Sequence, residues 1–305
     1  MTKRSKSQVW FEEESAFQPR RVAPLRHSFA DHPSLQLDSL KRLAIRLKAA
    51  GRDQVKHIEA GATSEDPLLF LPEDDRGRSL EEVFDRVEEP GSWVSLYNVQ
   101  TDPEYRELVT EVMQSSAHLL EEKDPGAFET DGFIFVSSAP SATPFHIDRE
   151  NNFFLQIHGR KRMSVWDPAD RVVVPEEKVE SKMGLNSTSS MPFKNEHFAR
   201  AAFNQELRAG EGVYIPATSG HTTNTEALPV GDDDTYSISI GVVFYTRSTR
   251  RAAYVYALNQ FLRRHGLRPR PPYESALRDR LKYPFGRSLV LARKILQGFR
   301  VPPGM

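Results

Sequence analysis

The chain has 305 residues, of which 38% are hydrophobic and 10% aromatic, so it suits one large folded domain or two smaller ones rather than global disorder. It has no cysteine, which excludes disulfides and thiolate metal sites, so a metal would need nitrogen and oxygen ligands. The first residues lack the apolar segment of a secretion signal, and no apolar run reaches membrane-spanning length. We therefore expect a cytoplasmic protein.

Positive charge is concentrated in residues 247–305. They carry fourteen Lys and Arg against two acidic residues, a formal charge of +12, so the preceding residues must carry −13 to reach the total of −1. A basic end of this size attracts an anionic surface. We favour the acidic body of the same protein, and nucleic acid, an acidic carrier protein or phospholipid are the alternatives.

Residues 1–125 are predicted to form an N-terminal arm followed by helices that buttress a β-domain. Residues 1–35 have scattered charge and proline and suggest an irregular arm. Asp38 is expected to cap a helix with one leucine-rich face, and Gly51 to end it. The elements expected next are an edge strand at 55–58, a loop at 59–78, a helix from the Ser79–Glu82 capping box to Pro90, a strand at 93–99 and a long helix from Asp102 to beyond Leu120.

Residues 126–246 are predicted to form the core of a mainly β protein with flanking helices. Short strands separated by tight turns favour a double-stranded β-helix of the jelly-roll, cupin-like type. Gly241 lies inside the last strand, where it indicates either a close approach of a ligand or a bulge. Residues 174–200 lack periodicity and are expected to form an irregular lid or substrate-binding loop. The predicted strands are 132–138, a strand through His146, 152–159, 160–166, 203–208, 213–216 and 236–245.

A metal site is predicted from His146 and Asp148, which project from one face of a strand because they are two residues apart. His221 follows a glycine turn and a strand, and it is the best third ligand. His197 competes for this role, but its flanking residues do not resemble a strand. Two histidines and one carboxylate leave three coordination positions open, as in non-haem Fe(II) oxygenases. The open positions can bind a bidentate cosubstrate and O2.

Lys161 is the candidate that binds a cosubstrate, since it follows His146 closely enough to lie in the same sheet. A lysine that faces the inside of an apolar barrel is costly to bury without an anionic partner. A dicarboxylate would provide this partner. The alternative is a solvated turn lysine between Arg160 and Arg162.

Three sequence patterns resemble a known family. They are Thr-Pro-x-His-x-Asp from Thr143, Asn-Phe-Phe-x-Gln-Ile-x-Gly-x-Lys-Arg from Asn152, and Gly-x-Tyr-Ile-Pro followed by His221. Together they resemble the jumonji C (cupin-like) family of Fe(II)/2-oxoglutarate oxygenases, and most closely the asparaginyl hydroxylase of hypoxia-inducible factor. The resemblance covers about residues 132–168 and 207–245.

The resemblance implies a role for each matching residue. His146, Asp148 and His221 would bind Fe(II), and Lys161, Thr143 and Asn152 would bind 2-oxoglutarate, the last by lining its pocket. The chain departs from the asparaginyl hydroxylase in the last strand, where Gly241-Val242-Val243 replaces an asparagine, and the cosubstrate-binding tyrosine of that enzyme has no clear match. The resemblance therefore does not identify the substrate of this chain.

The function implied is hydroxylation of a C–H bond in a peptide, protein or small molecule, with O2 consumed and succinate and CO2 released. One alternative is a non-catalytic cupin-type metal-binding or regulatory module with a basic tail, which would not need Lys161 and Thr143. Another is a non-oxidative metal enzyme such as a sugar isomerase, which the missing His-x-His and Glu pattern disfavours.

Residues 247–305 are predicted to form a basic helical segment. Two helices with apolar faces are expected at 252–264 and 287–299, separated by an Arg/Pro segment at 268–272. In the resembling enzyme the C-terminal helices form a dimer, so a homodimer is the expected assembly. Binding of an anionic partner is the rival hypothesis for this segment.

Overall fold

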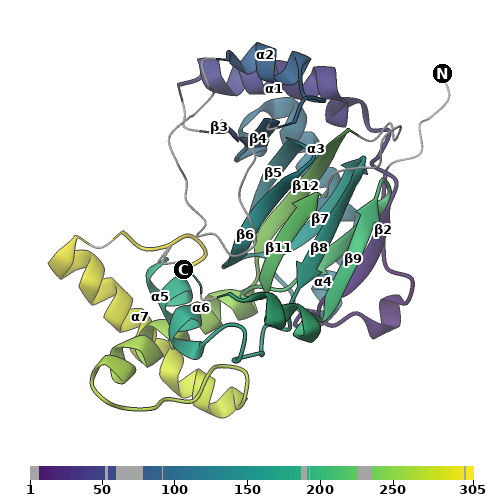
Figure 1. Cartoon of the computed structure of the whole chain (residues 1–305). Coiled ribbons are helices and arrows are strands. Elements are labelled where there is room, and N and C mark those ends of the chain that lie inside the picture. Colours follow the sequence, from purple (N-terminus) through teal and green to yellow (C-terminus); the bar gives the residue numbers. More distant parts are fainter. Residues whose placement is uncertain are drawn as a thin grey trace.

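Two antiparallel β-sheets of unequal size form the centre of the computed structural model (Figure 1). The structure describes residues 7–51, 54–59, 78–90, 92–186, 191, 193–225, 235–298 and 300–305. Within these residues the larger sheet has eight strands in the order β1-β2-β10-β7-β12-β5-β4-β3, and the smaller has four in the order β6-β11-β8-β9. This arrangement confirms the mainly β, cupin-like fold with flanking helices.

The strands have the following bounds. The larger sheet contains β1 (Val9–Trp10), β2 (Ala23–His27), β3 (Val55–Glu59), β4 (Ser92–Leu96), β5 (Phe128–Ser138), β7 (Asn151–His158), β10 (Glu211–Ile215) and β12 (Tyr236–Tyr245). The smaller sheet contains β6 (Ser141–Ile147), β8 (Arg160–Val165), β9 (Phe203–Arg208) and β11 (Gly220–Thr225).

The larger sheet has a helix-covered outer face and an inner face that looks toward the smaller sheet. Alternate residues such as Ile134, Leu155 and Ile240 are 0% exposed and belong to one core with the helices. The intervening residues point inward, where Phe154 packs with Met163 of β8 in a separate cluster. The helices on the outer side are α1 (Leu37–Ala49), α2 (Leu80–Asp85), α3 (Pro103–Ser115) and α4 (Ala117–Lys123).

Helix α1 buries the predicted leucine face and ends at Ala49, and Gly51, the predicted stop, follows the C-cap residue with a positive φ of 67°. Gln36, however, occupies the N-cap position, so the prediction that Asp38 caps the helix was wrong. Asp38 lies in the first turn, where its charge still favours the helix dipole.

The expected long helix after Asp102 is instead two helices. Asp102 caps α3 as predicted, with Pro103 at its first position. The helix is interrupted at Ser116, however, and α4 begins at the next residue. The break lets Val112 of α3 and Leu120 of α4 both reach the core of the larger sheet. The α2 capping box is confirmed, although α2 ends at Asp85 rather than at Pro90.

The N-terminal arm is more ordered than predicted. β2 pairs with β10 through registers such as Leu25 with Gly212, and β1 pairs with β2 and forms the edge of the larger sheet. The sequence signal for this strand was weak because it contains Pro24. Proline cannot donate a ladder hydrogen bond, so it is tolerated in a strand mainly near a sheet edge. The predicted edge strand at 55–58 is confirmed as β3, whereas most of the predicted loop at 59–78 lies outside the described residues.

The insertion at 174–200 contains a helix, so its prediction as an irregular loop was wrong. Helix α5 (Glu176–Leu185) packs against α6, where a Cβ on Gly184 would lie 2.9 Å from the Cα of Ala257. The buried Glu180 accepts hydrogen bonds from Arg263 at 2.8 and 3.0 Å. These tertiary contacts stabilise a helix whose own sequence is hardly amphipathic.

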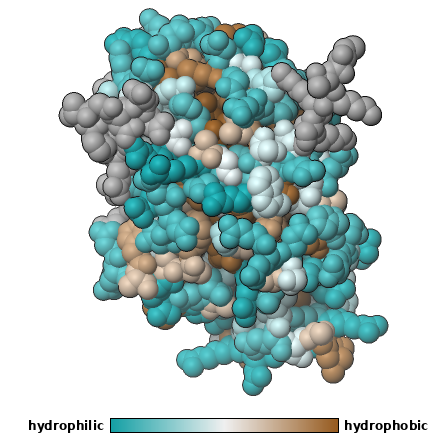
Figure 2. Space-filling model, turned by 90° about the vertical axis from the view of Figure 1, so that its right-hand side faces the viewer, coloured by the Kyte–Doolittle hydropathy of each residue, from teal (hydrophilic) through white to brown (hydrophobic). Residues whose placement is uncertain are grey.

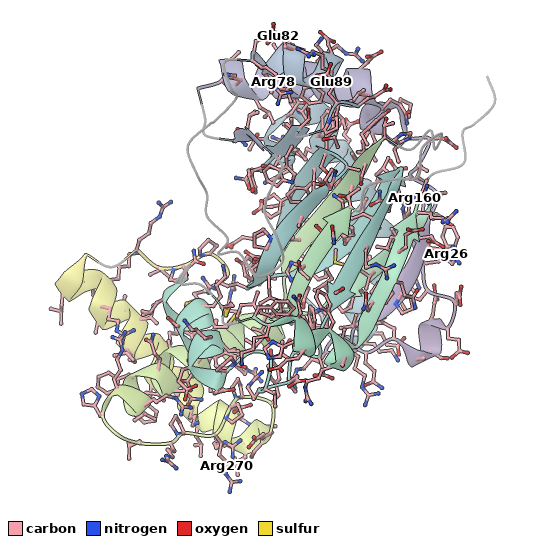
Figure 3. All side chains as sticks on the ribbon, in the orientation of Figure 1. Arg26, Arg78, Glu82, Glu89, Arg160 and Arg270 are labelled. Carbon is pink, nitrogen blue, oxygen red and sulfur yellow. The ribbon has the colours of Figure 1, made fainter. Side chains whose placement is uncertain are left out.

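The C-terminal segment consists of α6 (Arg247–Arg264) and α7 (Ala276–Gln297), both longer than predicted. α7 continues through Pro284, and its predicted apolar stripe is largely exposed, with Ile295 and Leu296 at 70% and 80%. Figure 2 shows hydrophobic residues among hydrophilic ones at the lower end of the molecule, where these helices lie. Arg270, in the connection between them, points away from the barrel (Figure 3). Phe299 lies outside the described residues.

After α7 the chain returns to the barrel. Gly304 donates a backbone hydrogen bond to Glu129 at 2.8 Å, and a Cβ at Gly304 would lie 2.3 Å from the ring of Tyr245. Met305 packs against a second core formed by β6, α5 and α6. Among the described residues, no helix has the length and apolar character needed to cross a membrane.

Candidate metal centre

The two predicted histidine ligands lie side by side on adjacent strands of the smaller sheet. His146 of β6 and His221 of β11 are direct partners in the antiparallel register, and their ring centroids are 4.1 Å apart. Directly opposed residues share one face of a sheet. The pairing therefore brings together two residues that are far apart in the sequence.

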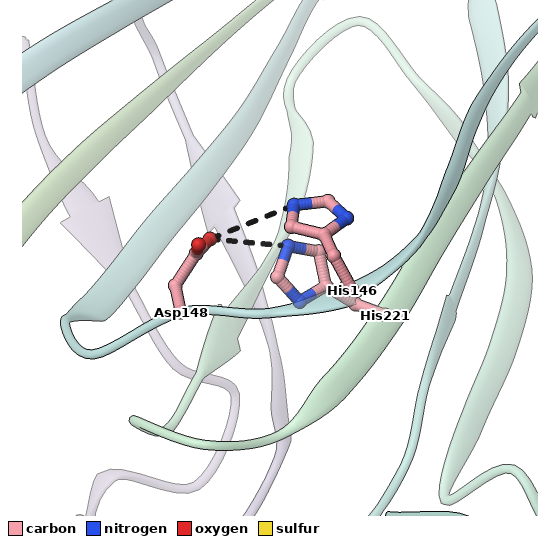
Figure 4. Close-up of side chains that lie close together, drawn as sticks. All are labelled: His146, Asp148 and His221. Atoms are coloured by element: carbon pink, nitrogen blue, oxygen red, sulfur yellow. Dashed lines mark ion pairs between the residues drawn. The ribbon is translucent and has the colours of Figure 1, made fainter. Parts of the chain in front are cut away.

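Asp148 completes the cluster from the turn that follows β6. Its Oδ2 lies 3.7 Å from His146 Nε2 and 3.5 Å from His221 Nε2 (Figure 4). Potential ligand atoms of the three residues all lie within 4.8 Å of one another, and no other such cluster of metal-ligating groups occurs in the part of the chain that the structure describes. The backbone carbonyl of Asp148 accepts a hydrogen bond from Thr218 N at 2.8 Å, which fixes the turn.

Backbone carbonyls orient both imidazoles for metal binding. His146 Nδ1 lies 2.8 Å from Pro144 O, and His221 Nδ1 lies 3.1 Å from Ser219 O. A carbonyl only accepts, so each Nδ1 carries the proton and each Nε2 presents a lone pair. Two lone pairs and a carboxylate then converge, and a cation relieves their mutual repulsion. The donor set fits Fe(II).

The site favours the protonation states that bind metal. Burial, assisted by the neighbouring His221, lowers the pKa of His146 to about 4, so this imidazole is neutral near pH 7. Burial opposes ionisation of Asp148, but the two imidazoles and Lys182 of α5 outweigh it and hold its pKa below the usual range. A neutral imidazole and an ionised carboxylate are what a divalent metal requires.

Lys161 points into the barrel, as predicted, rather than into solvent. It lies on β8 in the same sheet as the histidines, with β11 between β8 and β6, and it is only 4% exposed. Its one hydrogen bond among the described residues is a long one, 3.5 Å, to Ser239 Oγ. Burial lowers the pKa of Lys161 to about 8. A buried ammonium group with this little compensation is suited to an anionic ligand.

Thr143 shares a face with His146 because β6 contains a bulge. His146 pairs with His221 and Thr143 pairs with Thr223, so three residues of β6 match two of β11. Without the bulge, a separation of three would place Thr143 on the opposite face. The sequence hint was Pro144, which cannot donate a ladder hydrogen bond. Asn152, on β7, pairs with Val243, and its Oδ1 is buried without a hydrogen-bond partner.

His197 does not join the metal cluster. It lies in a 3₁₀ turn (Asn195–Arg200), where its ring packs 5.4 Å from the ring of Phe193 and its carbonyl accepts a hydrogen bond from Trp166 Nε1 at 2.8 Å. The structure thus brings together the preferred three residues and leaves the competing histidine in a packing role.

The turn after Asp148 contains residues that sequence reasoning did not single out. Glu150 accepts hydrogen bonds from the hydroxyl of Tyr245 and from the backbone of Arg149. Burial and the nearby Asp148 raise the pKa of Glu150. The only sequence signal for a role of Arg149 and Glu150 in the site was their position directly after Asp148. The contact with Tyr245 could not be predicted, because it depends on the fold.

Comparison with known proteins supports the fold assignment. A family model described as "Cupin-like domain" matches residues 36–250. A crystal structure of Escherichia coli ycfD is similar, with a TM-score of 0.50 and 15% identity over 95% of this chain and 70% of that one. A structure of E. coli YcfD, described as a ribosomal oxygenase in complex with cobalt and 2-oxoglutarate, has a TM-score of 0.46 and 16% identity over 94% and 68%.

No curated protein sequence matches the chain significantly. The similarity to the solved structures is too distant to show more than a shared fold. The family match, in contrast, covers more than half of the chain and includes all three residues of the metal cluster. The chain therefore belongs to the cupin-like domain family, the jumonji C-related group that its sequence motifs resemble.

Proposed function

We propose that the chain is an Fe(II)- and 2-oxoglutarate-dependent oxygenase. It would hydroxylate a C–H bond of a peptide or protein side chain, or of a small molecule, and release succinate and CO2. The observation that carries this proposal is the placement of a buried, sparsely bonded Lys161 inside the same barrel as a His-Asp-His cluster. A purely structural metal site has no need of a buried cation beside it.

Each residue of the site would have a distinct part in this reaction. His146, Asp148 and His221 would hold the metal on one side and leave the other side open. When bound, Fe(II) supplies the centre at which O2 is activated while the keto acid is oxidised. Lys161 and Thr143 would hold the distal carboxylate of 2-oxoglutarate, because both face the inside of the barrel.

The barrel itself would orient the cosubstrate and exclude water. Asn152 lines the inner face of the larger sheet with a free acceptor, Oδ1. Phe154, Met163 and Val213 belong to one apolar cluster between the two sheets and are 0–4% exposed. A low-dielectric wall strengthens the attraction between Lys161 and a carboxylate, so the cosubstrate is held in one orientation.

The decisive experiment is to bind Fe(II) and 2-oxoglutarate under anaerobic conditions, then admit O2 and measure succinate. Succinate formed without a second substrate would support the reaction class, since such enzymes turn over the keto acid slowly when uncoupled. The matched control is Asp148→Ala, which removes one metal ligand. The proposal fails if the wild-type chain binds Fe(II) but neither binds 2-oxoglutarate nor yields succinate above this control.

A further inference from the structure

A groove lies between the C-terminal helices, where α5, α6 and α7 gather below the barrel (Figure 1). α6 packs against both of its neighbours. It approaches α7 closely at Gly286, where an added Cβ would lie 2.0 Å from Tyr254 O. Phe261 and Arg293 lie about two helical turns further along α6 and α7, and both line the groove. We call this site the α6–α7 groove.

The walls of the α6–α7 groove are mostly apolar. Its volume is about 450 Å³, which falls in the range of small-molecule sites. Phe261 and Leu296 are 37% and 80% exposed, so part of the apolar surface is open to solvent and would be stabilised by a ligand that covers it. The apolar lining residues are Leu185 at the end of α5, Phe261 of α6, and Leu289, Ala292 and Leu296 of α7.

The remaining lining residues of the α6–α7 groove are all basic. They are Arg264, His265 and Arg293, and no acidic residue of the described chain lines the groove. His265 is fixed against the apolar wall, because its Nδ1 lies 2.8 Å from Phe261 O and its ring centroid lies 4.4 Å from that of Phe261. Two guanidinium groups and an imidazole around one apolar groove produce a positive potential that attracts an anion.

Neither arginine of the groove forms an ion pair within the described part of the chain. Arg263, directly before Arg264, shows the contrast, because it pairs with Glu180 at 2.8 Å. Arg293 is half-buried, and its Nη1 is fully covered without a hydrogen-bond partner among the described residues. A covered guanidinium N–H without an acceptor is costly. A carboxylate in the groove would supply the missing acceptor and balance the charge.

We propose that the α6–α7 groove binds a free alkyl carboxylate. Its chain would lie along the apolar walls between the helices, and its carboxylate would contact Arg264 and Arg293, whose planar forks match carboxylate geometry. Apolar walls alone would accept a neutral ligand, and arginines alone would accept any anion, so the two features together select an amphiphilic anion. The site is separate from the proposed oxygenase site, since it shares no residue with the metal cluster.

Two other occupants match the groove less well. A second copy of the chain in a symmetric contact would bring the same basic groove of both copies together, and these like charges repel. An anionic membrane surface would attract the arginines, but it is nearly planar, whereas the Nη1 of Arg293 is covered and accessible only to a group that enters the groove.

Isothermal titration of the full chain with three probes tests the ligand class. Decanoate has both the chain and the carboxylate, decyltrimethylammonium has the same chain with a cationic head, and acetate has the carboxylate alone. Below micelle-forming concentrations, decanoate should bind saturably at one site, and the other two probes at least about tenfold more weakly. Absence of saturable decanoate binding, or equal binding of the cationic probe, would overturn the proposal.

Matched variants test whether decanoate binds in this groove. Arg293→Gln should weaken decanoate about tenfold, because it removes a charge-assisted hydrogen bond. Ala292→Trp should fill the apolar part and abolish binding without changing any charge. Arg287→Gln, at an exposed position of α7 outside the groove, should change nothing. All three variants should retain Fe(II) binding, which reports an intact barrel. Unchanged decanoate affinity in Arg293→Gln and Ala292→Trp would place the ligand elsewhere and overturn the proposal.

Sedimentation and vesicle binding identify the other occupants. If a second copy fills the groove, the wild type is a dimer that does not bind decanoate, and Ala292→Trp lowers its mass. If a membrane surface covers the groove, the chain binds vesicles of anionic lipid but not monomeric decanoate. Either result would overturn the proposal, and the succinate assay of the oxygenase function would be unaffected by it.

Discussion

The amide of Asn152 lies in the space that a side chain at position 241 would occupy. A Cβ built on Gly241 would be 3.0 Å from Asn152 Oδ1 and 3.1 Å from its Nδ2. The glycine in the last strand is thus explained by a neighbouring side chain, and β12 keeps regular pairing there rather than a bulge.

Gly241→Ala is expected to displace Asn152 by a few tenths of an ångström and to weaken 2-oxoglutarate several-fold. Isothermal titration with Fe(II) already bound would measure this change. Asn152→Ala should weaken the cosubstrate to a similar degree, and adding Gly241→Ala to it should have little further effect, because the two changes act through one group. Fully additive effects would show that Gly241 does not act through Asn152.

Replacing His146, Asp148 or His221 by alanine is expected to reduce Fe(II) affinity by orders of magnitude. Each change removes one of three protein ligands whose atoms lie within 4.8 Å of one another. Metal content after dialysis against Fe(II) would show the loss. His197→Ala is the control and should retain normal metal content, and loss of metal in this variant alone would mean that the ligands are assigned wrongly.

Lys161→Ala should weaken 2-oxoglutarate binding by about 2 kcal/mol, or roughly 30-fold, because a charge-assisted hydrogen bond in a dry pocket is lost. Fe(II) affinity should hardly change, since Lys161 is not a ligand. Arg162→Ala, on the same strand with its side chain facing outward, is a suitable control. Unchanged cosubstrate affinity in Lys161→Ala would remove Lys161 from the site.

Cosubstrate binding is also expected to depend on pH. The pKa of Lys161 in the free protein is about 8, so the ammonium form that binds a carboxylate predominates below pH 8 and is lost above it. Affinity for 2-oxoglutarate should therefore fall as pH rises from 7 to 9.5. Lys161→Arg keeps its charge throughout this range and should flatten the profile, whatever its absolute affinity. A similar fall in both proteins would point to another group.

We propose that the exposed face of α7 forms a homodimer contact. Leu277, Leu281 and Phe285 are 70%, 62% and 68% exposed and follow one another at helical spacing. Leu281→Glu should shift the sedimentation coefficient toward that of the monomer, whereas Arg280→Glu beside it should not. A monomeric wild type that binds an anionic macromolecule through its arginines would favour the rival hypothesis for the basic segment.

The sequence predicted the fold and the metal cluster because both depend on strong local patterns. The alternation in 236–245 and the leucine face of α1 each reflect burial on one side of an element. The His-x-Asp spacing instead brings two metal-ligating groups together, with His146 on β6 and Asp148 in the turn that follows it. The sequence did not predict the features that depend on tertiary contacts. Helix α5 depends on Arg263 from another helix, and the placement of Thr143 depends on a bulge visible only in the pairing of β6 with β11.

The return of the chain from α7 to Tyr245 sets an order for local unfolding. Thr246, the N-cap of α6, directly follows Tyr245, and Gly304 packs against the ring of Tyr245. Residues 246–304 therefore form a loop whose two ends meet at Tyr245. Residues 300–305, the tail, are held to the barrel by Gly304 and Met305, α7 is largely exposed, and α6 shares a core with β6. Amide hydrogens should therefore exchange first in the tail, next in α7 and last in α6, whose opening would also loosen the strand that carries His146.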